Sequence, residues 1–567
     1  MGELGWTASL GSYQKAVDAA LVRMADERVM PRLWARDHTL WKPQPTEITN
    51  RLGWLHIAEE MREALPGITA LADAARQEGY THALLLGMGG SSLAPEVFAK
   101  TYGAAKGHLE LAVLDSTDPG AVLAFAETLD PARTLFLVST KSGGTVETLS
   151  AFKYFYNWVA RAVGAEAAGR HFVAITDPGS SLAALAERYR FRQTFLNDPN
   201  IGGRYSALSY FGLVPAALLG VDLAKLLERA IEGACGSDAC VTAHDNPAAR
   251  LGAVIGELAK AGRDKLTLIT SPAIASLGDW VEQLVAESVG KEGKGVLPVV
   301  GEPVGAPAAY GSDRLFVYLT VKGDRVHGAA VRALEQAGQP VVRLTLGDRY
   351  DLGGQFSIWE LATAVVGYLL EVNPFDQPNV ESAKVRAREM VAAYAERGAL
   401  PAEQPALTAE GVAVYGDVAA KGPGEALRDF LAMGQGSGYV SVQAYIQSTP
   451  AADQALRALR LAIRERYKLA VTVGYGPRFL HSTGQLHKGD AGNGLFIQVT
   501  ADDSRDARIP DEAGKEASAM SFSVLKAAQA LGDRQALLDA GRRVIRFHLG
   551  TDAAAGLRRL ARALGGA

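Results

Sequence analysis

The stretch that decides the fold is HALLLGMGGSSLAPE, at residues 82–96. Its apolar half, His82–Gly87, leads directly into a turn rich in glycine and serine and then into a helical pattern. Short apolar runs at residues 109–115, 134–140, 171–177 and 192–197 alternate with amphipathic stretches in the same way. Because strands separated by helices are typical of βαβ units, this part of the chain predicts a doubly wound parallel sheet.

Two further series of apolar runs continue the pattern, at residues 265–270, 314–321 and 341–346 and at residues 439–446, 469–475 and 495–500. Helical periodicity without a convincing strand fills the first 80 residues, at 13–27 and 54–75. Stretches with Pro and Gly near 398–405 and 421–424 indicate domain boundaries. We therefore predict an α/β protein with a helical segment at 1–80, domains at 81–245 and 246–395, and a third α/β segment at 396–567.

Charge, cysteine content and hydropathy narrow the class of protein. The 567 residues include 58 Lys+Arg and 62 Asp+Glu, a net charge of −4, which predicts neither a nucleic-acid partner nor a membrane partner. Two cysteines alone, Cys235 and Cys240, form no disulfide framework and no four-ligand zinc site. The longest apolar run, at 210–221, is shorter than the roughly 20 residues of a membrane helix, and the N-terminus has no secretory pattern. We expect a cytoplasmic protein.

The turn at residues 87–92 is a candidate anion site. Glycines allow close backbone approach, the following helix offers free N–H groups, and Gly90 and Ser91 lie at its centre. The spacing is not that of a dinucleotide site, because Ser92 stands where the third glycine belongs, and no Gly-Lys-Ser/Thr follows as in a nucleotide loop. The alternative is a tight turn with a serine N-cap.

A second turn of this kind, TKSGGTVET, follows the apolar run at 134–140. Thr140, Lys141, Ser142 and Thr145 surround a glycine pair at the start of a helix, an arrangement that can bind a phosphate dianion without a metal. The alternative is a capping box with Thr145 as N-cap and a solvated Lys141. Two hydroxyl-rich turns after neighbouring strands favour a phosphosugar pocket.

These turns resemble those of the sugar isomerase (SIS) domain, and three further segments resemble the glucose-6-phosphate isomerase family. The segments are NIGGRYS at 200–206, ESVGK at 287–291, and NPFDQP at 373–378 with Lys384 after it. The stretch DHTLWK at 37–42 is similar to the linker that precedes the isomerase half of bifunctional transaldolase/glucose-6-phosphate isomerases. Since no transaldolase barrel fits before residue 80, transaldolase activity is not implied.

Glu287 is the candidate base. Helical periodicity over 279–287 predicts that Gln283 and Glu287 share one helix face. The resemblance implies that Glu287 is the catalytic base and Gln283 a substrate contact. From the residues alone, an i,i+4 ion pair between Glu287 and Lys291 is the competing interpretation.

Arg204 follows a glycine pair, and its permanent charge suits the stabilisation of an enediolate. A structural pair with Asp198 is the alternative. The resemblance further implies that Lys384 assists opening of the sugar ring and that Gln377 binds substrate by a hydrogen bond.

The position of the catalytic histidine departs from the pattern of the family, which places this residue between the catalytic glutamate and the lysine, here Glu287 and Lys384. There this chain has only His327, in a context that does not match. The stretch LHSTGQLHKG at 480–489 resembles the family's histidine motif instead, so we assign His481 to ring opening, since an imidazole titrates near neutral pH. His487, or a histidine that only caps the turn, are the alternatives.

The resemblance implies interconversion of glucose 6-phosphate and fructose 6-phosphate through ring opening and a cis-enediol, with no metal or redox cofactor, by a homodimer. Three alternatives stay open: a dual phosphoglucose/phosphomannose isomerase, a phosphosugar sensor without catalysis, and a scaffold role for residues 396–567.

Overall fold

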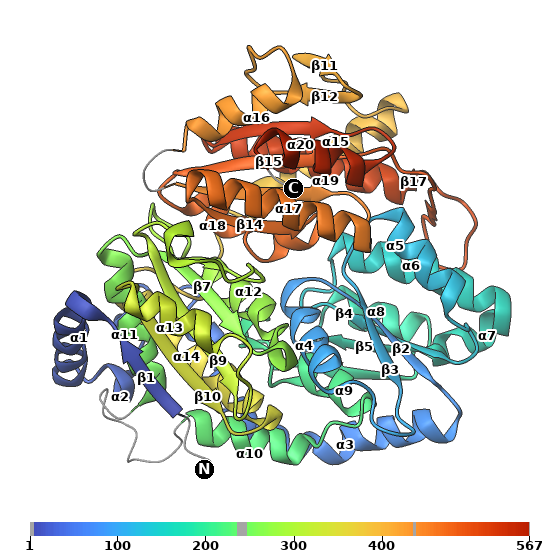
Figure 1. Cartoon of the computed structure of the whole chain (residues 1–567). Coiled ribbons are helices and arrows are strands. Elements are labelled where there is room, and N and C mark those ends of the chain that lie inside the picture. The colour runs from blue at the N-terminus through green and yellow to red at the C-terminus, as the bar shows by residue number, and fades with distance from the viewer. Residues whose placement is uncertain (1–4, 235–245, 435–437, 566–567) are drawn as a thin grey trace. The chain divides into compact units, whose positions relative to one another are not determined.

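The computed structural model describes residues 5–234, 246–434 and 438–565, which form two compact units (Figure 1). The first unit comprises residues 1–115, 129–304 and 313–377, and the second comprises 116–128, 305–312 and 378–567. Cys235 and Cys240 lie outside the described residues. Within the described ranges, no helix is both long and apolar enough to cross a bilayer.

The first sheet of the first unit is parallel throughout, with strand order β3-β2-β4-β5-β6. Its strands are β2 (His82–Gly87), β3 (Glu110–Leu114), β4 (Thr134–Ser139), β5 (Phe172–Thr176) and β6 (Gln193–Leu196). Its helices are α4 (Leu93–Tyr102), α6 (Val146–Val163), α7 (Ala165–Ala168), α8 (Ser181–Arg188) and α9 (Tyr210–Leu218). The strand order reverses between β2 and β4, which makes the crevice at their carboxyl ends the place where such sheets bind ligands.

The second sheet of this unit has strand order β1-β10-β9-β7-β8. β7 (Lys265–Thr270), β8 (Leu297–Val299), β9 (Arg314–Val321) and β10 (Val341–Leu346) are parallel, and β1 (Gly5–Ser9) joins the edge antiparallel. The expectation that the first 80 residues contain no strand is therefore wrong. β1 is short and partly exposed, so its sequence carries no buried apolar run.

The other described helices of this unit contribute much of its hydrophobic core. They are α1 (Gln14–Asp26), α2 (Val29–Trp34), α3 (Ile57–Gln77), α10 (Leu223–Ala234), α11 (Pro247–Lys260), α12 (Leu277–Val289), α13 (Gly328–Gln336) and α14 (Leu352–Leu369). α14 packs against α10, α11 and α12 and is buried along nearly its whole length. Its Glu360 lies in the core, where burial raises the pKa of the carboxyl well above its usual range.

The second unit contains a six-stranded sheet of order β11-β12-β18-β15-β13-β14. The strands are β11 (Leu407–Ala409), β12 (Val412–Tyr415), β13 (Tyr439–Tyr445), β14 (Ala470–Tyr475), β15 (Gly494–Thr500) and β18 (Arg543–His548), with a small hairpin of β16 (Arg508–Ile509) and β17 (Met520–Ser521). Its helices are α5 (Pro119–Thr128), α15 (Glu381–Arg397), α16 (Pro423–Ala432), α17 (Pro450–Tyr467), α18 (Gly484–Gly489), α19 (Phe522–Asp539) and α20 (Ala553–Ala563). β13, β14, β15 and β18 run parallel.

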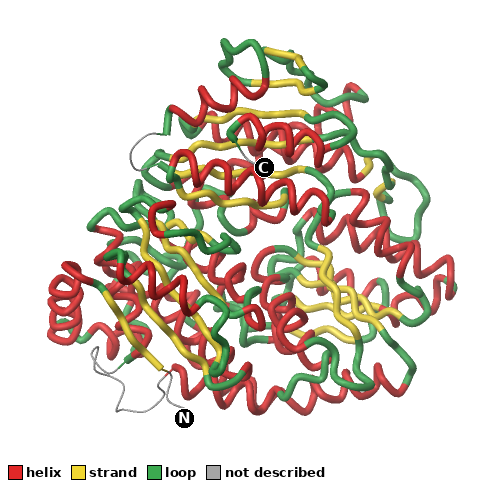
Figure 2. The backbone as a smooth tube through the Cα atoms, viewed as in Figure 1, coloured by secondary structure: helices red, strands yellow, loops and turns green. Residues whose placement is uncertain are grey.

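The predicted α/β class with parallel sheets is confirmed. Figure 2 shows the yellow strands of each large sheet lying side by side with red helices next to them. All the expected strands are present. Those that the sequence analysis missed are short, as β8 is, or carry charged residues, as β18 does. The predicted domain boundaries at residues 80, 245 and 395 stay a prediction.

Candidate functional site

The first glycine-rich turn forms a short 3-10 helix, η5 (Gly89–Ser91), directly after β2. Ser91 is buried, and its carbonyl accepts a hydrogen bond from Ser139 Oγ at the end of β4 (3.1 Å). Ser92 Oγ donates to Gly89 O (3.1 Å) and Asp115 Oδ2 (3.2 Å) and makes no cap hydrogen bond to the described part of α4. The structure therefore does not support the alternative of a turn that a serine merely caps.

Gly90 brings this turn against a second one, η7 (Gly203–Tyr205). A Cβ at residue 90 would lie 2.0 Å from Gly203 O and 2.8 Å from Arg204 N, both backbone atoms. Only glycine permits an approach this close. Since η5 also contacts α12, the first loop, Arg204 and the helix of Glu287 adjoin one another.

The second glycine-rich turn follows β4, the neighbour of β2 in the sheet. Thr140 Oγ1 and Thr145 Oγ1 lie 2.8 Å apart, and Ser142 Oγ accepts from Gly144 N (3.4 Å). Lys141 is not merely solvated: its ammonium donates to the Asp177 carboxylate and to Pro199 O (2.9 Å). Thr145 makes no cap hydrogen bond to the described part of α6, so the predicted alternative of a capping box is wrong.

Arg204 lies at the centre of a buried polar network, with its side chain only 3% exposed. Five oxygens surround the guanidinium: Ser288 Oγ (2.8 Å from Nε), Gln377 Oε1 (3.0 Å) and Glu287 Oε1 (3.1 Å) at Nη1, and Pro374 O (2.7 Å) and Asp376 O (2.9 Å) at Nη2. A guanidinium has five N–H donors, so donors and acceptors match in number. The alternative pair with Asp198 is not what the structure shows.

Glu287 projects from α12 and is 14% exposed. Gln283, one turn earlier on the same helix, donates from Nε2 to Glu287 Oε2 (3.0 Å), while Arg204 holds Oε1. Gln283 and Glu287 therefore do share one helix face. The carboxylate is fixed from both sides, partly open to solvent, and thus suited to accept and return a proton.

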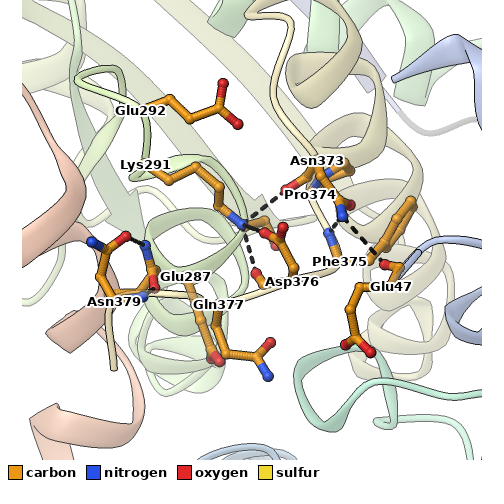
Figure 3. A network of polar contacts seen from close by, with 12 residues as sticks. Glu47, Glu287, Lys291, Glu292, Asn373, Pro374, Phe375, Asp376, Gln377 and Asn379 are labelled. Carbon is orange, nitrogen blue, oxygen red and sulfur yellow. Dashed lines mark hydrogen bonds and ion pairs between the residues drawn. The ribbon is translucent and has the colours of Figure 1, made fainter. Parts of the chain in front are cut away.

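Lys291 does not pair with Glu287. α12 ends at Val289 and Gly290 leaves the helical region (φ −83°, ψ 71°), so Lys291 is no longer one helical turn from Glu287 on the same face. Its ammonium donates instead to Asn373 O (2.8 Å), Asp376 O (2.6 Å) and Asp376 Oδ1 (2.7 Å), as Figure 3 shows. The competing interpretation of an i,i+4 ion pair is therefore wrong.

The segment at residues 373–377 is itself anchored by aromatic packing. Phe375 is buried against Trp41 (4.9 Å between ring centroids) and Tyr205 (5.4 Å). Burial raises the pKa of the Tyr205 hydroxyl, which lies 3.2 Å from Ser288 Oγ. Gln377 is thus carried at the end of a fixed turn.

Lys384 and His481 belong to the second unit. Lys384 lies on α15, 53% exposed, with Glu381 as its nearest carboxylate (3.7 Å). His481 ends η12 (Arg478–His481) and is half-buried. His487 is a core residue on α18: burial, together with the charges of Lys488 and Arg542, lowers the pKa of its imidazole well below the usual range.

The structure thus brings together Glu287, Gln283, Arg204 and Gln377 in the first unit, in which both glycine-rich turns also lie. Sequence reasoning missed three members of this network, Ser288, Pro374 and Asp376. All three stand inside the quoted motifs ESVGK and NPFDQP, so membership of a motif was the available signal.

The fold and the site define a class: α/β proteins that present glycine-rich turns at the carboxyl edge of a doubly wound parallel sheet. Solved structures similar to this chain include the following two. A hypothetical protein from Thermus thermophilus matches with a TM-score of 0.59 and 27% identity over 68% of this chain and all of that one. A glucose-6-phosphate isomerase from Chlamydia trachomatis matches with a TM-score of 0.57 and 18% identity over 69% of this chain and 89% of that one.

Sequence comparisons give the family. The family model for phosphoglucose isomerase matches residues 57–294. The glucose-6-phosphate isomerase of Rubrobacter xylanophilus is 30% identical over 421 residues, 65% of this chain and 94% of that protein. A glucose-6-phosphate isomerase of Thermus thermophilus is 30% identical over 390 residues, 60% of this chain and 90% of that protein. The chain belongs to the glucose-6-phosphate isomerase family.

Proposed function

We propose that this chain interconverts glucose 6-phosphate and fructose 6-phosphate by ring opening and a cis-enediol intermediate. The observation that carries the proposal is the carboxylate of Glu287, held by Gln283 Nε2 (3.0 Å) and Arg204 Nη1 (3.1 Å) on a helix that adjoins the first glycine-rich turn. A positioned carboxylate beside a fixed cation is what a proton transfer between two adjacent carbons requires.

The substrate phosphate is assigned to the two turns. We assign the phosphate to a position beside the hydroxyls of Thr140, Ser142 and Thr145 and the start of α6, where backbone N–H groups and the positive end of the helix dipole favour an anion. Gly90 and Ser91 line the neighbouring turn. Lys141 adds positive charge, but its ammonium also pairs with the Asp177 carboxylate. Hydroxyl and backbone donors therefore make the larger contribution to phosphate binding.

The chemical step is assigned to the network around Glu287. Glu287 removes the proton from C2 of the open-chain aldose and returns it to C1, and negative charge develops on the two enediol oxygens in between. Arg204 stabilises that charge, because its guanidinium is fixed before the reaction begins and needs no reorganisation. Gln283 and Gln377, which hold Glu287 and Arg204, also orient the sugar hydroxyls.

Ring opening is assigned to His481 and Lys384, on the strength of the family resemblance. His481 is half-buried and adjoins the buried Ser482 and Thr483, in a turn that leads into α18. We also propose a homodimer, which rests on the resemblance and which light scattering of the purified protein tests. A cytoplasmic location, expected from the sequence, completes the proposal.

The test is to incubate the purified, chelator-treated protein with fructose 6-phosphate and follow the products by proton NMR. The proposal predicts glucose 6-phosphate as the product. Mannose 6-phosphate appearing beside it would favour the dual isomerase. Retained binding of fructose 6-phosphate without turnover would refute catalysis and favour the sensor.

A further inference from the structure

Lys291 is a buried cation for which the proposed chemistry has no role. Its side chain is 1% exposed, and its three ammonium protons have three oxygen acceptors at 2.6–2.8 Å, from Asn373 and Asp376. Figure 3 shows its side chain extended toward the 373–376 segment. Burying an ammonium is costly unless it is fully paired, so this arrangement holds both Lys291 and the segment in place.

The same segment is held from its other side by Arg204. Nη2 of Arg204 binds Pro374 O and Asp376 O, and Nη1 binds Gln377 Oε1. Asp376 O therefore accepts from both cations, at 2.6 Å from Lys291 and 2.9 Å from Arg204. Any movement of this carbonyl changes the position of the guanidinium, and with it the position of the Glu287 carboxylate that the guanidinium binds.

We propose that Lys291 is a positioning residue for the isomerase reaction: it fixes the Asn373–Gln377 turn, and through Asp376 O and Gln377 it sets the geometry of the Arg204–Glu287 pair. The inference rests on the proposed function, in which that pair carries the proton transfer. Lys291 itself touches no reacting atom; it acts through the turn.

The charges around Lys291 add a second consequence. Burial, and then the charge of Arg204, lower the pKa of Lys291 to about 8, while Asp376 and Glu287 oppose the shift. A neutral amine has two N–H donors in place of three, so one of the three oxygens loses its donor as the pH rises through this range. The turn is then held less firmly in alkaline solution.

The experiment compares Lys291→Met, Lys291→Arg and Lys294→Met. Lys294 is the matched control, since it is 41% exposed and donates to Leu370 O (2.7 Å), outside the turn. kcat and KM for fructose 6-phosphate are measured across neutral and alkaline pH, with unfolding temperature and circular dichroism as checks of folding.

We expect Lys291→Met to lower kcat by about 100-fold with little change in KM, because the acid–base geometry moves while the phosphate turns do not. Lys294→Met keeps the wild-type kcat. Lys291→Arg restores part of the activity, and its kcat no longer falls near pH 8, because a guanidinium stays charged there.

A folded Lys291→Met enzyme with wild-type kcat would overturn the inference. If Lys291→Met fails to fold, the pH dependence of kcat in Lys291→Arg tests the inference instead. A fall of kcat in alkaline solution identical to that of the wild type would also overturn the inference. Failure of the proposed function gives different results: either the wild-type protein shows no turnover, or Glu287→Gln keeps full activity.

Discussion

The close approach of the first glycine-rich turn to the Arg204 turn makes a sharp prediction for Gly90→Ala. The added Cβ would lie 2.0 Å from Gly203 O and 2.2 Å from Gly203 C, whereas real Cβ atoms essentially never approach closer than 3.0 Å. Both neighbours are backbone, so the clash cannot be relieved by a side-chain rotation. The two turns must move apart by about 1 Å.

The size of the effect follows from that displacement. Misplacement of a catalytic group by about 1 Å costs roughly 100-fold in rate, or about 2.7 kcal/mol of transition-state stabilisation. Overpacking at a rigid contact also lowers the free energy of unfolding, by about 1–3 kcal/mol. Gly90→Ala should therefore lose about 100-fold in kcat/KM while remaining folded at 25 °C.

Gly203→Ala is the matched control, because it adds the same methyl group on the other side of the same contact. A Cβ at Gly203 meets no described atom within 4 Å. Both variants are assayed for conversion of fructose 6-phosphate, with denaturant unfolding alongside. If Gly90→Ala matches Gly203→Ala in kcat/KM, the reasoning that the two turns form one rigid site is refuted.

Three further predictions follow from the same structure. In Arg204→Lys, an ammonium with three N–H donors replaces a guanidinium that binds five oxygens, so at least two oxygens lose their donor. At about 1–3 kcal/mol for each oxygen, the free energy of unfolding measured in urea should fall by about 2–6 kcal/mol. An unchanged free energy of unfolding would contradict the network. Burial raises the pKa of Glu360 above its unfolded value of 4.5. The contribution of the protonated carboxyl to the free energy of unfolding is therefore fully present below pH 4.5 and is lost as the pH rises through the folded pKa. Glu360→Gln should remove that loss in a series of unfolding temperatures against pH, and parallel curves for both proteins would refute it. His481→Asn should lower kcat by about 100-fold if His481 moves a proton in ring opening, whereas an unchanged kcat would favour a scaffold role for the third segment.

Much of the fold could be predicted because parallel βαβ units leave a regular pattern in the sequence. Buried strands such as β4, with six buried residues in a row, appear as apolar runs, and their turns carry glycine where a ligand or another backbone comes close. β1 leaves no such pattern: it is a five-residue edge strand whose pairing with β10 depends on residues more than 300 positions away. Nothing in its local sequence specifies that partner.

The sequence predicted which residues belong to the site better than it predicted which of them contact one another. Gln283 and Glu287 meet because a helix places residues four apart on one face, which periodicity alone indicates. The same rule failed for Glu287 and Lys291, because the helix ends between them at Val289. The partners of Arg204 come from α12 and from the 373–377 turn, and long-range contacts of this kind follow from tertiary packing that no local spacing encodes.

The central claim is that Glu287 transfers the C2 proton, and deuterium incorporation tests it most directly. Fructose 6-phosphate is incubated in deuterated water with wild type, Glu287→Gln and, as a control on the same helix, Glu282→Gln, and the C2 position of the glucose 6-phosphate formed is followed by NMR. The account predicts deuterium at C2 with wild type and Glu282→Gln, and its loss with Glu287→Gln. Incorporation by folded Glu287→Gln at the wild-type rate would contradict it.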